Sequence, residues 1–246
     1  MVAHYMNIEG IKGKVVVLDT RNGKFSKDKA FKESWDALYP DRIDYKGLTT
    51  IIDVDVDAKT ITYLEYSSVD AYEEEDTSAA IKKIHKYEVC NIIPLNKCSP
   101  VTKMADIKTN AAGFAMMDGY TFRSASDKNV YVIGDAVGHK VPPSGQSTVW
   151  GAKRVATQVA AQINGKSFDA VQGLPANAAN VCYSMVNGKP DEAIMVTHVF
   201  VADESGVIKG KGSVPKPKDG NGKYRSPGIG KATREWFSGI KRELFS

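Results

Sequence analysis

Long apolar runs are missing from this sequence of 246 residues, and no apolar stretch approaches the length needed to cross a bilayer. We therefore expect no membrane span. The opening residues Met1–Met6 carry neither the basic segment nor the apolar segment of a signal peptide. The net charge of +4 is small, and Lys and Arg do not gather beside aromatic residues. This pattern argues against a nucleic-acid-binding groove.

Cysteine and histidine are scarce as well. The three cysteines, Cys90, Cys98 and Cys182, and the four histidines follow no zinc-binding spacing, so we expect no metal site. The acidic run Glu73–Asp76 indicates a solvated loop rather than a metal site. Cys90 lies in an apolar run, which favours an inert thiol.

A dinucleotide-binding glycine motif is also missing. No Gly-x-Gly-x-x-Gly follows the first strand-like run, and the nearest candidate, Asp19–Gly23, lacks the spacing. The sequence therefore lacks the loop that normally holds the pyrophosphate of a dinucleotide.

The residues that are present predict alternating strands and helices. A β-branched run, an amphipathic helix and a second short strand indicate a crossover unit of an α/β layer, and two alternating runs then predict a hairpin or meander. The expected strands are Lys14–Asp19, Ile43–Tyr45, Thr49–Val56, Thr60–Tyr66, Tyr87–Pro94, Asn129–Ile133, Val181–Met185 and Ala193–Val201. The expected helices are Lys27–Leu38 with Ser26 as its cap, Gln146–Ile163 and Thr233–Phe245, and Gly206–Gly230 is expected to be a loop.

The segment Val130–Lys153 carries the most specific chemistry. Its predicted strand ends at Gly134, and Asp135 and Ala136 follow at the carboxyl end, where open α/β sheets bind ligands. The Asp135 carboxylate can accept hydrogen bonds from the hydroxyl groups of a polyol such as a ribityl chain.

A helix follows this strand after a loop that contains Pro142. It is expected to begin near Ser144 and Gly145 and to direct its backbone N–H groups and the positive end of its dipole towards the same place. Such a helix end stabilises the negative charge of a reduced flavin. The ensemble of strand, Gly-Asp-Ala, loop and helix therefore predicts a flavin contact.

The stretch Tyr131–Ala136 resembles the second flavin-binding fingerprint of the pyridine nucleotide-disulfide oxidoreductase superfamily. More specifically, the chain resembles the flavoprotein subunit of flavocytochrome c sulfide dehydrogenase. The similar stretches are Val15–Ser26, Cys90–Pro94, Val132–Lys153, Asn180–Val186 and Glu235–Ser246.

The resemblance implies an α/β fold, α+β overall, with partial FAD/NAD(P)-binding Rossmann-like domains, a β-meander and a small α+β C-terminal domain. Residues 1–95 would be the remainder of a second, NAD-like dinucleotide domain. Residues 96–170 would be the returning segment of the FAD-binding domain, and residues 171–246 the C-terminal domain of the sulfide dehydrogenase type.

The resemblance also implies site residues. Cys182 matches the second cysteine of a redox-active disulfide over the flavin, and the first cysteine is absent from this sequence. Cys98 is an alternative partner for Cys182. Trp236 resembles a terminal tryptophan that packs near the flavin, and an ordinary helix anchor is an equal alternative.

The implied function is FAD-dependent oxidation of sulfide or polysulfide, with electron transfer to a cytochrome c subunit in the periplasm. Because the first flavin fingerprint is missing, the chain alone is expected to bind FAD weakly or not at all. Two alternatives remain open, a related sulfide:quinone or disulfide oxidoreductase and a non-catalytic fragment that docks a partner. Thr233–Ser246 has five Lys, Arg and Glu residues, which argues against embedding in lipid.

Overall fold

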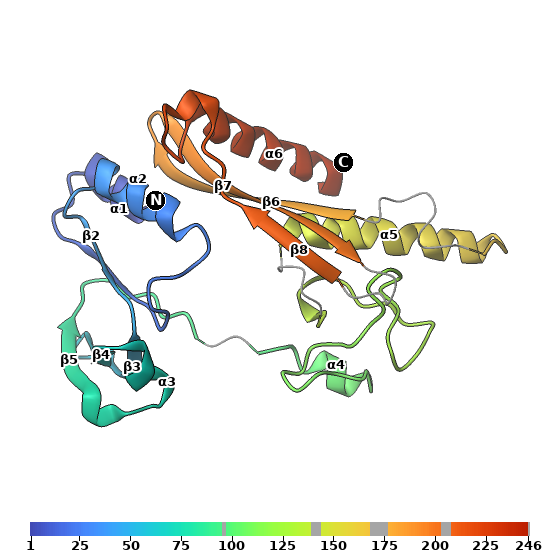
Figure 1. Ribbon diagram of the computed structural model, residues 1–246, viewed down its shortest axis with the longest axis horizontal. Helices are drawn as coiled ribbons and strands as arrows, with labels where there is room; N and C mark the ends of the chain where they lie inside the picture. Colours follow the sequence, from blue (N-terminus) through green and yellow to red (C-terminus); the bar gives the residue numbers. More distant parts are fainter. Residues whose placement is uncertain (95–96, 139–143, 168–176, 203–207, 246) are drawn as a thin grey trace. The chain divides into compact units, whose positions relative to one another are not determined.

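The computed structural model describes residues 1–94, 97–138, 144–167, 177–202 and 208–245, which form a mixed α and β protein, as the sequence predicts (Figure 1). Two compact units are present. Unit 1 holds Met1–Ile93, Tyr183–Met195 and Lys216–Ser246, and unit 2 holds Pro94–Cys182 and Val196–Pro215. The division into domains at residues 95 and 170 stays a prediction.

Helices and strands occur in both units. The α-helices are α1 (Val2–Ile8), α2 (Asp28–Leu38), α3 (Val69–Glu73), α4 (Val101–Met104), α5 (Gly145–Ile163) and α6 (Pro227–Phe245), and the 3-10 helices are η1 (Thr77–Ala79), η2 (Gly134–Ala136) and η3 (Lys218–Gly220). The strands are β1 (Val15–Leu18), β2 (Ile43–Lys46), β3 (Thr49–Asp55), β4 (Thr60–Tyr66), β5 (Ala80–Lys86), β6 (Asn177–Gly188), β7 (Asp191–Ala202) and β8 (Ile208–Ser213). The sheet orders are β1-β2, β3-β4-β5 and β6-β7-β8.

The predicted crossover unit is confirmed in unit 1. Strands β1 and β2 pair in parallel, with α2 between them in the chain. The aromatic face of α2 packs towards β2, since the Trp35 ring lies 5.5 Å from Phe31 and 6.3 Å from Tyr45, measured between centroids. The predicted Ser26 cap is wrong, because the residue before the helix is Lys27, in the left-handed conformation with φ 64° and without a side-chain cap.

The predicted hairpin or meander is confirmed, and its third strand lies at residues for which the sequence predicts no strand. β4 pairs with β3 on one side and with β5 on the other. The predicted strand Tyr87–Pro94 is not a strand, and Val89 and Ile93 are 91% and 78% exposed. The residues that pair with β4 are the alternating Ala80–Lys86, which follow it after one short excursion through α3 and η1.

The predicted strand Asn129–Ile133 is wrong as well. Its backbone makes one isolated antiparallel bridge, between Arg123 and Tyr131, instead of joining a parallel sheet among the described residues. Val137 makes a parallel bridge with Ala115, and these two residues form a small buried cluster with Val132. The segment Asn129–Ile133 therefore contributes an apolar residue to this cluster of unit 2 but does not form a regular strand.

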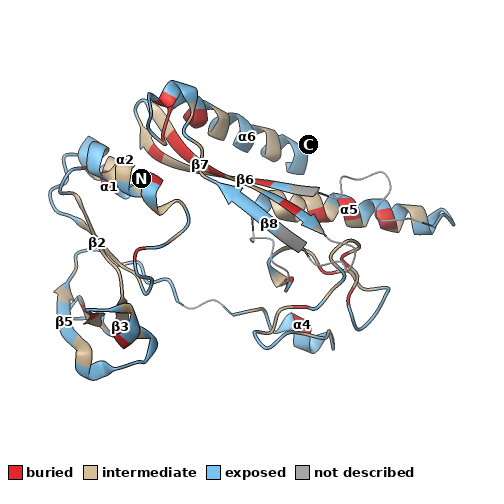
Figure 2. Cartoon of the chain, in the orientation of Figure 1, coloured by how far each residue is buried: buried red, intermediate tan, exposed pale blue. Residues whose placement is uncertain are grey.

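The long helix α5 confirms the predicted helix Gln146–Ile163 and ends at Asn164. Some residues of α5 are buried (Figure 2), and two of them, Arg154 and Gln158, have polar side chains. Arg154 donates from Nε to the carbonyl of Tyr120, and Gln158 donates to the carbonyl of Thr121 over 2.9 Å. Because a buried polar group costs free energy unless it is paired, these bonds fix the 120–121 turn against α5.

Strand β8 lies in the segment that the sequence predicts to be a loop. Its Gly210 and Gly212 are opposite Phe200 and His198 of β7. A side-chain carbon at Gly210 or Gly212 would lie only 2.4 Å or 2.5 Å from those rings. The rings cover the glycines, so a glycine-rich segment with low strand propensity still pairs as a strand.

Helix α6 includes the predicted helix Thr233–Phe245 and begins at Pro227. It lies along the connected ends of β6 and β7 in unit 1 (Figure 1), where Arg234 forms a two-point ion pair with Asp191. None of the helices in the described part of the chain has the length and apolar character of a membrane span.

Two glycines of α6 give a matched test of this packing. A side-chain carbon at Gly230 would lie 2.5 Å from the backbone oxygen of Asp191, whereas at Gly239 it would meet nothing within 4 Å. Gly230→Ala should lower the free energy of unfolding by about 1–3 kcal/mol through overpacking. Gly239→Ala should raise it by about 0.5–1 kcal/mol through helix propensity.

Urea unfolding followed by far-UV circular dichroism measures both effects. Equal midpoints for the two variants would contradict the close approach of α6 to β7.

Candidate functional site

The predicted flavin-contacting segment folds as the 3-10 turn η2 rather than as a strand end. Gly134 has φ +72°, a left-handed conformation that glycine adopts without strain. A side-chain carbon at Gly134 would lie 3.5 Å from Thr148 on α5. The turn therefore packs against the first turns of α5.

Ser144 caps the N-terminus of α5, which begins where the sequence predicts, near Ser144. The Ser144 hydroxyl oxygen accepts a hydrogen bond from the backbone N–H of Ser147 over 3.2 Å. The Ser144 carbonyl accepts from the backbone and the hydroxyl of Thr148, both over 3.0 Å. These bonds connect the helix start to the same threonine that Gly134 contacts.

The Ser144 side chain also connects α5 to β6. Its hydroxyl lies 3.1 Å from Oδ1 of Asn180, a residue that is 1% exposed. The Asn180 amide nitrogen lies 3.4 Å from the sulfur of Cys182. One residue along, the Val181 N–H donates to Gln146 of α5 over 2.7 Å. These contacts hold the strand that carries Cys182 beside the first turn of α5.

Asp135 differs from these residues because its carboxylate is open to a ligand. It is exposed, and no described residue donates a hydrogen bond or forms an ion pair with it. Gly145, the first residue of α5, is also exposed, and a side-chain carbon there would meet nothing within 4 Å. An acceptor for polyol hydroxyls and a helix N-terminus are therefore both accessible in unit 2.

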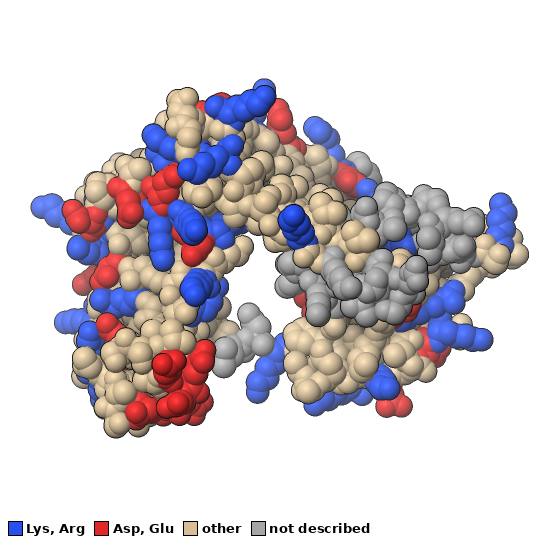
Figure 3. All heavy atoms as spheres, viewed as in Figure 1, with Lys and Arg blue, Asp and Glu red and all other residues tan. Residues whose placement is uncertain are grey.

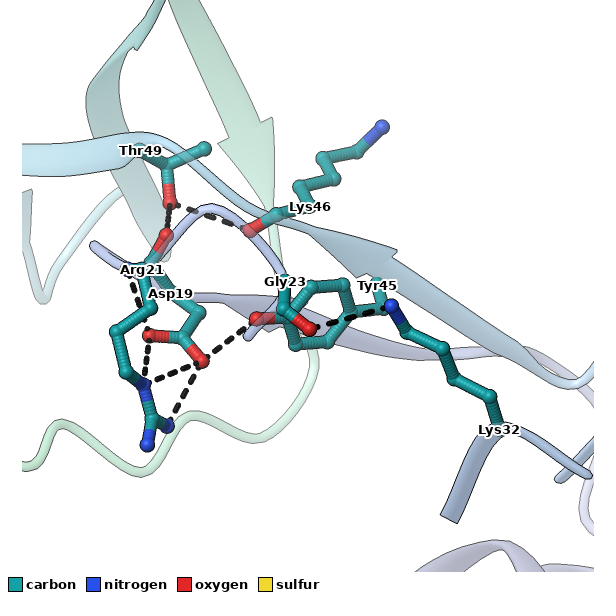
Figure 4. Close-up of polar contacts among 7 residues, drawn as sticks. All are labelled: Asp19, Arg21, Gly23, Lys32, Tyr45, Lys46 and Thr49. Atoms are coloured by element: carbon teal, nitrogen blue, oxygen red, sulfur yellow. Dashed lines mark hydrogen bonds and ion pairs between the residues drawn. The ribbon is translucent and has the colours of Figure 1, made fainter. Parts of the chain in front are cut away.

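A second polar cluster lies in unit 1 at the carboxyl end of β1 (Figure 4). The Asp19 carboxylate accepts hydrogen bonds from the Arg21 guanidinium, the shortest over 2.8 Å, and from the Tyr45 hydroxyl over 2.7 Å. Its backbone carbonyl accepts from the N–H and the hydroxyl of Thr49, over 3.0 Å and 3.2 Å. This cluster joins the crossover unit to the start of β3.

Comparison with known families gives a match over part of the chain. The family model for the central part of the sulfide dehydrogenase [flavocytochrome c] flavoprotein chain matches residues 1–94 of the 246. This part of the chain is therefore similar to that flavoprotein family. The name of the family implies a flavin cofactor for its members.

Two solved structures were compared with this chain. A chain in the cryo-EM structure of the Tetrahymena thermophila mitochondrial ATP synthase is 15% identical, with a TM-score of 0.62, which shows a similar fold. The alignment covers 98% of this chain and 52% of that chain, so this chain spans about half of its length. The crystal structure of reduced Bacillus anthracis CoADR-RHD aligns at 13% identity over 84% of this chain and 40% of that chain, with a TM-score of 0.45.

Most of the site residues predicted from the sequence lie in unit 2. The contacts through Thr148 and Asn180 connect Gly134 to Ser144 and Ser144 to Cys182. Asp135 and Ala136 belong to the turn that begins at Gly134, and Gly145 follows Ser144 directly. Pro142 lies outside the described residues.

Trp236 belongs to unit 1, on α6, where it is 37% exposed and its ring centroid lies 6.3 Å from that of Tyr183. This contact fits the helix-anchor alternative, and a role near a flavin stays a prediction. Cys98 is a free thiol whose sulfur lies 3.9 Å from the Thr102 hydroxyl, so the alternative disulfide with Cys182 is not formed.

Acidic side chains gather over α3 in unit 1 (Figure 3). Asp76 uses its carboxylate locally, since it accepts from the N–H and the hydroxyl of Ser78. No three metal-ligating side chains come together in the parts of the chain that the structure describes. The run Glu73–Asp76 is exposed, as expected for a solvated segment, although it begins in the short helix α3.

The Asp19 cluster, which the sequence reasoning missed, is internally satisfied. Burial would raise the pKa of Asp19, but hydrogen bonds from Arg21 and Tyr45 and the positive charge of Arg21 outweigh burial and lower it. Burial and the hydrogen bond to Asp19 raise the pKa of Tyr45 to about 12. The signal for this cluster was an acid at the end of a β-branched run.

The directions of these pKa shifts predict how the stability of unit 1 depends on pH. The lowered pKa of Asp19 adds stability above its unfolded value, and this stability is lost as the pH falls through the folded value. Asp19→Asn should therefore lower the free energy of unfolding at pH 7 by about 1–3 kcal/mol, through loss of charge-assisted hydrogen bonds. It should also reduce the loss of stability between about pH 5 and pH 2.

Urea unfolding at several pH values tests this expectation. Asp53 is the matched control, because it is exposed on β3 and no described residue hydrogen-bonds its carboxylate. A wild-type acid dependence in Asp19→Asn would show that the cluster does not hold unit 1 together.

Proposed function

We propose that this chain supplies one wall of the flavin site and one reactive sulfur of an FAD-dependent sulfide:cytochrome c oxidoreductase. The observation that carries the proposal is the match of residues 1–94 to the central part of the sulfide dehydrogenase flavoprotein chain. The connected residues of unit 2 support it, because they join a candidate flavin contact to a cysteine.

The residues of unit 2 fit the sugar-alcohol part of FAD. The exposed Asp135 carboxylate offers acceptors for ribityl hydroxyl groups, and the accessible first turn of α5 offers backbone N–H donors near Gly145. Bound FAD would supply a two-electron acceptor. The helix N-terminus of α5 would then favour the negative charge of the reduced form.

Cys182 is the candidate reactive sulfur. It is half-buried, and the Asn180 amide and the first turn of α5 hold its position. A thiolate is the nucleophilic form of cysteine, and a nearby N–H donor and helix N-terminus both favour negative charge. These surroundings support a redox role in sulfide or polysulfide chemistry, and a cytochrome c subunit in the periplasm is the proposed electron acceptor.

The quinone-linked alternative has less support from α6. This helix has a two-point ion pair between Arg234 and Asp191 and an exposed ion pair between Lys231 and Glu235. Charged groups on a terminal helix are costly to bury among lipid chains. The geometry therefore supports a water-soluble electron acceptor better than a quinone dissolved in a membrane.

Titration with FAD tests the proposed flavin contact directly, because flavin fluorescence changes when the ring system or its side chain becomes bound. We expect saturable but weak binding, with a Kd on the order of 10–100 μM, because the wall lacks a pyrophosphate loop. Asp135→Leu should weaken it by about tenfold or more, through loss of charged hydrogen-bond acceptors.

Asp127→Leu is the matched control, since Asp127 is an exposed aspartate of the same unit, outside η2 and α5. It should bind FAD like the wild-type chain. Equal Kd values for Asp135→Leu and the wild type, or no saturable change up to millimolar FAD, would contradict the proposed contact. Stoichiometric FAD in the purified chain would contradict the idea that it holds only one wall.

A further inference from the structure

The side chain of Asn180 is the most deeply buried polar group next to the candidate reactive sulfur. Asn180 is 1% exposed, so its amide is almost completely withdrawn from water. A buried amide requires hydrogen-bond partners, and here the partners are Ser144 of α5 and Cys182 of the same strand. The residue therefore lies between the helix cap and the sulfur.

The two ends of the amide face Cys182 at nearly equal distances. The sulfur lies 3.4 Å from Nδ2 and 3.6 Å from Oδ1. A thiol can donate to Oδ1, whereas a thiolate can only accept, and Nδ2 lies within reach to donate to it. Asn180 can thus hydrogen-bond the sulfur in both protonation states without moving the backbone.

The Ser144 hydroxyl holds this amide in place. Its oxygen accepts from the Ser147 N–H, and its own proton can be donated to Oδ1 of Asn180, 3.1 Å away, or to the hydroxyl oxygen of Ser147, 3.0 Å away. The Gln146 side chain anchors the intervening residue Val181 over 2.7 Å. Two links from the first turn of α5 therefore fix both the strand and the amide beside Cys182.

The geometry points to Asn180 as a positioning residue that donates to the Cys182 sulfur and increases its reactivity as a thiolate. The inference rests on the proposed redox role of Cys182 and names the residue that controls it. It concerns the sulfur alone, so it is independent of whether the chain binds FAD.

Alkylation by iodoacetamide measures this effect in the purified chain. The thiolate displaces iodide and forms a thioether, after the thiol proton has passed to solvent. Mass spectrometry of the peptide that contains Cys182 gives its rate separately from those of Cys90 and Cys98. Cys98 lies in the same unit and is the internal control for changes in reagent or folding.

Asn180→Leu should slow alkylation of Cys182 at neutral pH by about fivefold, the effect of losing one net hydrogen bond to the thiolate. Asn180→Asp, which places a carboxylate at the same position, should slow it by about tenfold or more and move the midpoint of the rate–pH profile upwards. The rate at Cys98 should not change in either variant.

An increase in the alkylation rate of Cys182, instead of a decrease, would overturn the inference. If Asn180 only packs β6 against α5, its loss would expose Cys182 and the alkylation rate would rise. An unchanged rate would also overturn it, and circular dichroism of each variant shows whether the fold is retained. Failure of FAD binding in the titration would leave these rates unaffected, so the two proposals fail separately.

Discussion

The Ser144 hydroxyl is the interaction on which the candidate site depends. Its oxygen caps the N-terminus of α5 through Ser147, and its proton lies within hydrogen-bonding distance of Asn180 on β6. The Ser144 carbonyl binds Thr148, which packs beside Gly134. One residue thus connects the turn with the exposed Asp135, the start of a long helix and the strand with Cys182. A cap that usually stabilises only its own helix here joins three segments that are distant in sequence.

The carboxylates of Asp19 and Asp135 differ in whether they have hydrogen-bond partners among the described residues, and this difference bears on function. The Asp19 carboxylate in unit 1 is fully engaged by Arg21 and Tyr45, so it stabilises the junction between a crossover unit and a meander. The Asp135 carboxylate in unit 2 is exposed and has no partner among the described residues. A satisfied carboxylate contributes mainly to folding, whereas an open one beside a helix N-terminus is suited to a ligand.

Local patterns in the sequence predicted the parts of the fold that local physics controls. The crossover unit, the hairpin and α5 follow from the periodicity of apolar residues, and all are present. The errors occurred where a neighbour decides the structure. Strand β8 is stabilised by rings that cover its glycines, and the apolar run Asn129–Ile133 lacks parallel neighbours in the described structure. Asn180 and Thr148 gave no signal, because their importance comes only from contacts made across the fold.

Ser144 and Asn180 are expected to stabilise the fold through the hydrogen bond between them, and a double-mutant cycle measures this coupling directly. Ser144→Ala, Asn180→Ala and the double variant are unfolded in urea, with Trp150 on α5 as a fluorescent reporter in the same unit. A hydrogen bond between these two residues should give a coupling free energy of about 0.5–1.5 kcal/mol, the net value of one hydrogen bond between residues in contact. Strictly additive effects of the two substitutions would contradict it, because they would show that α5 and the strand with Cys182 are stabilised independently.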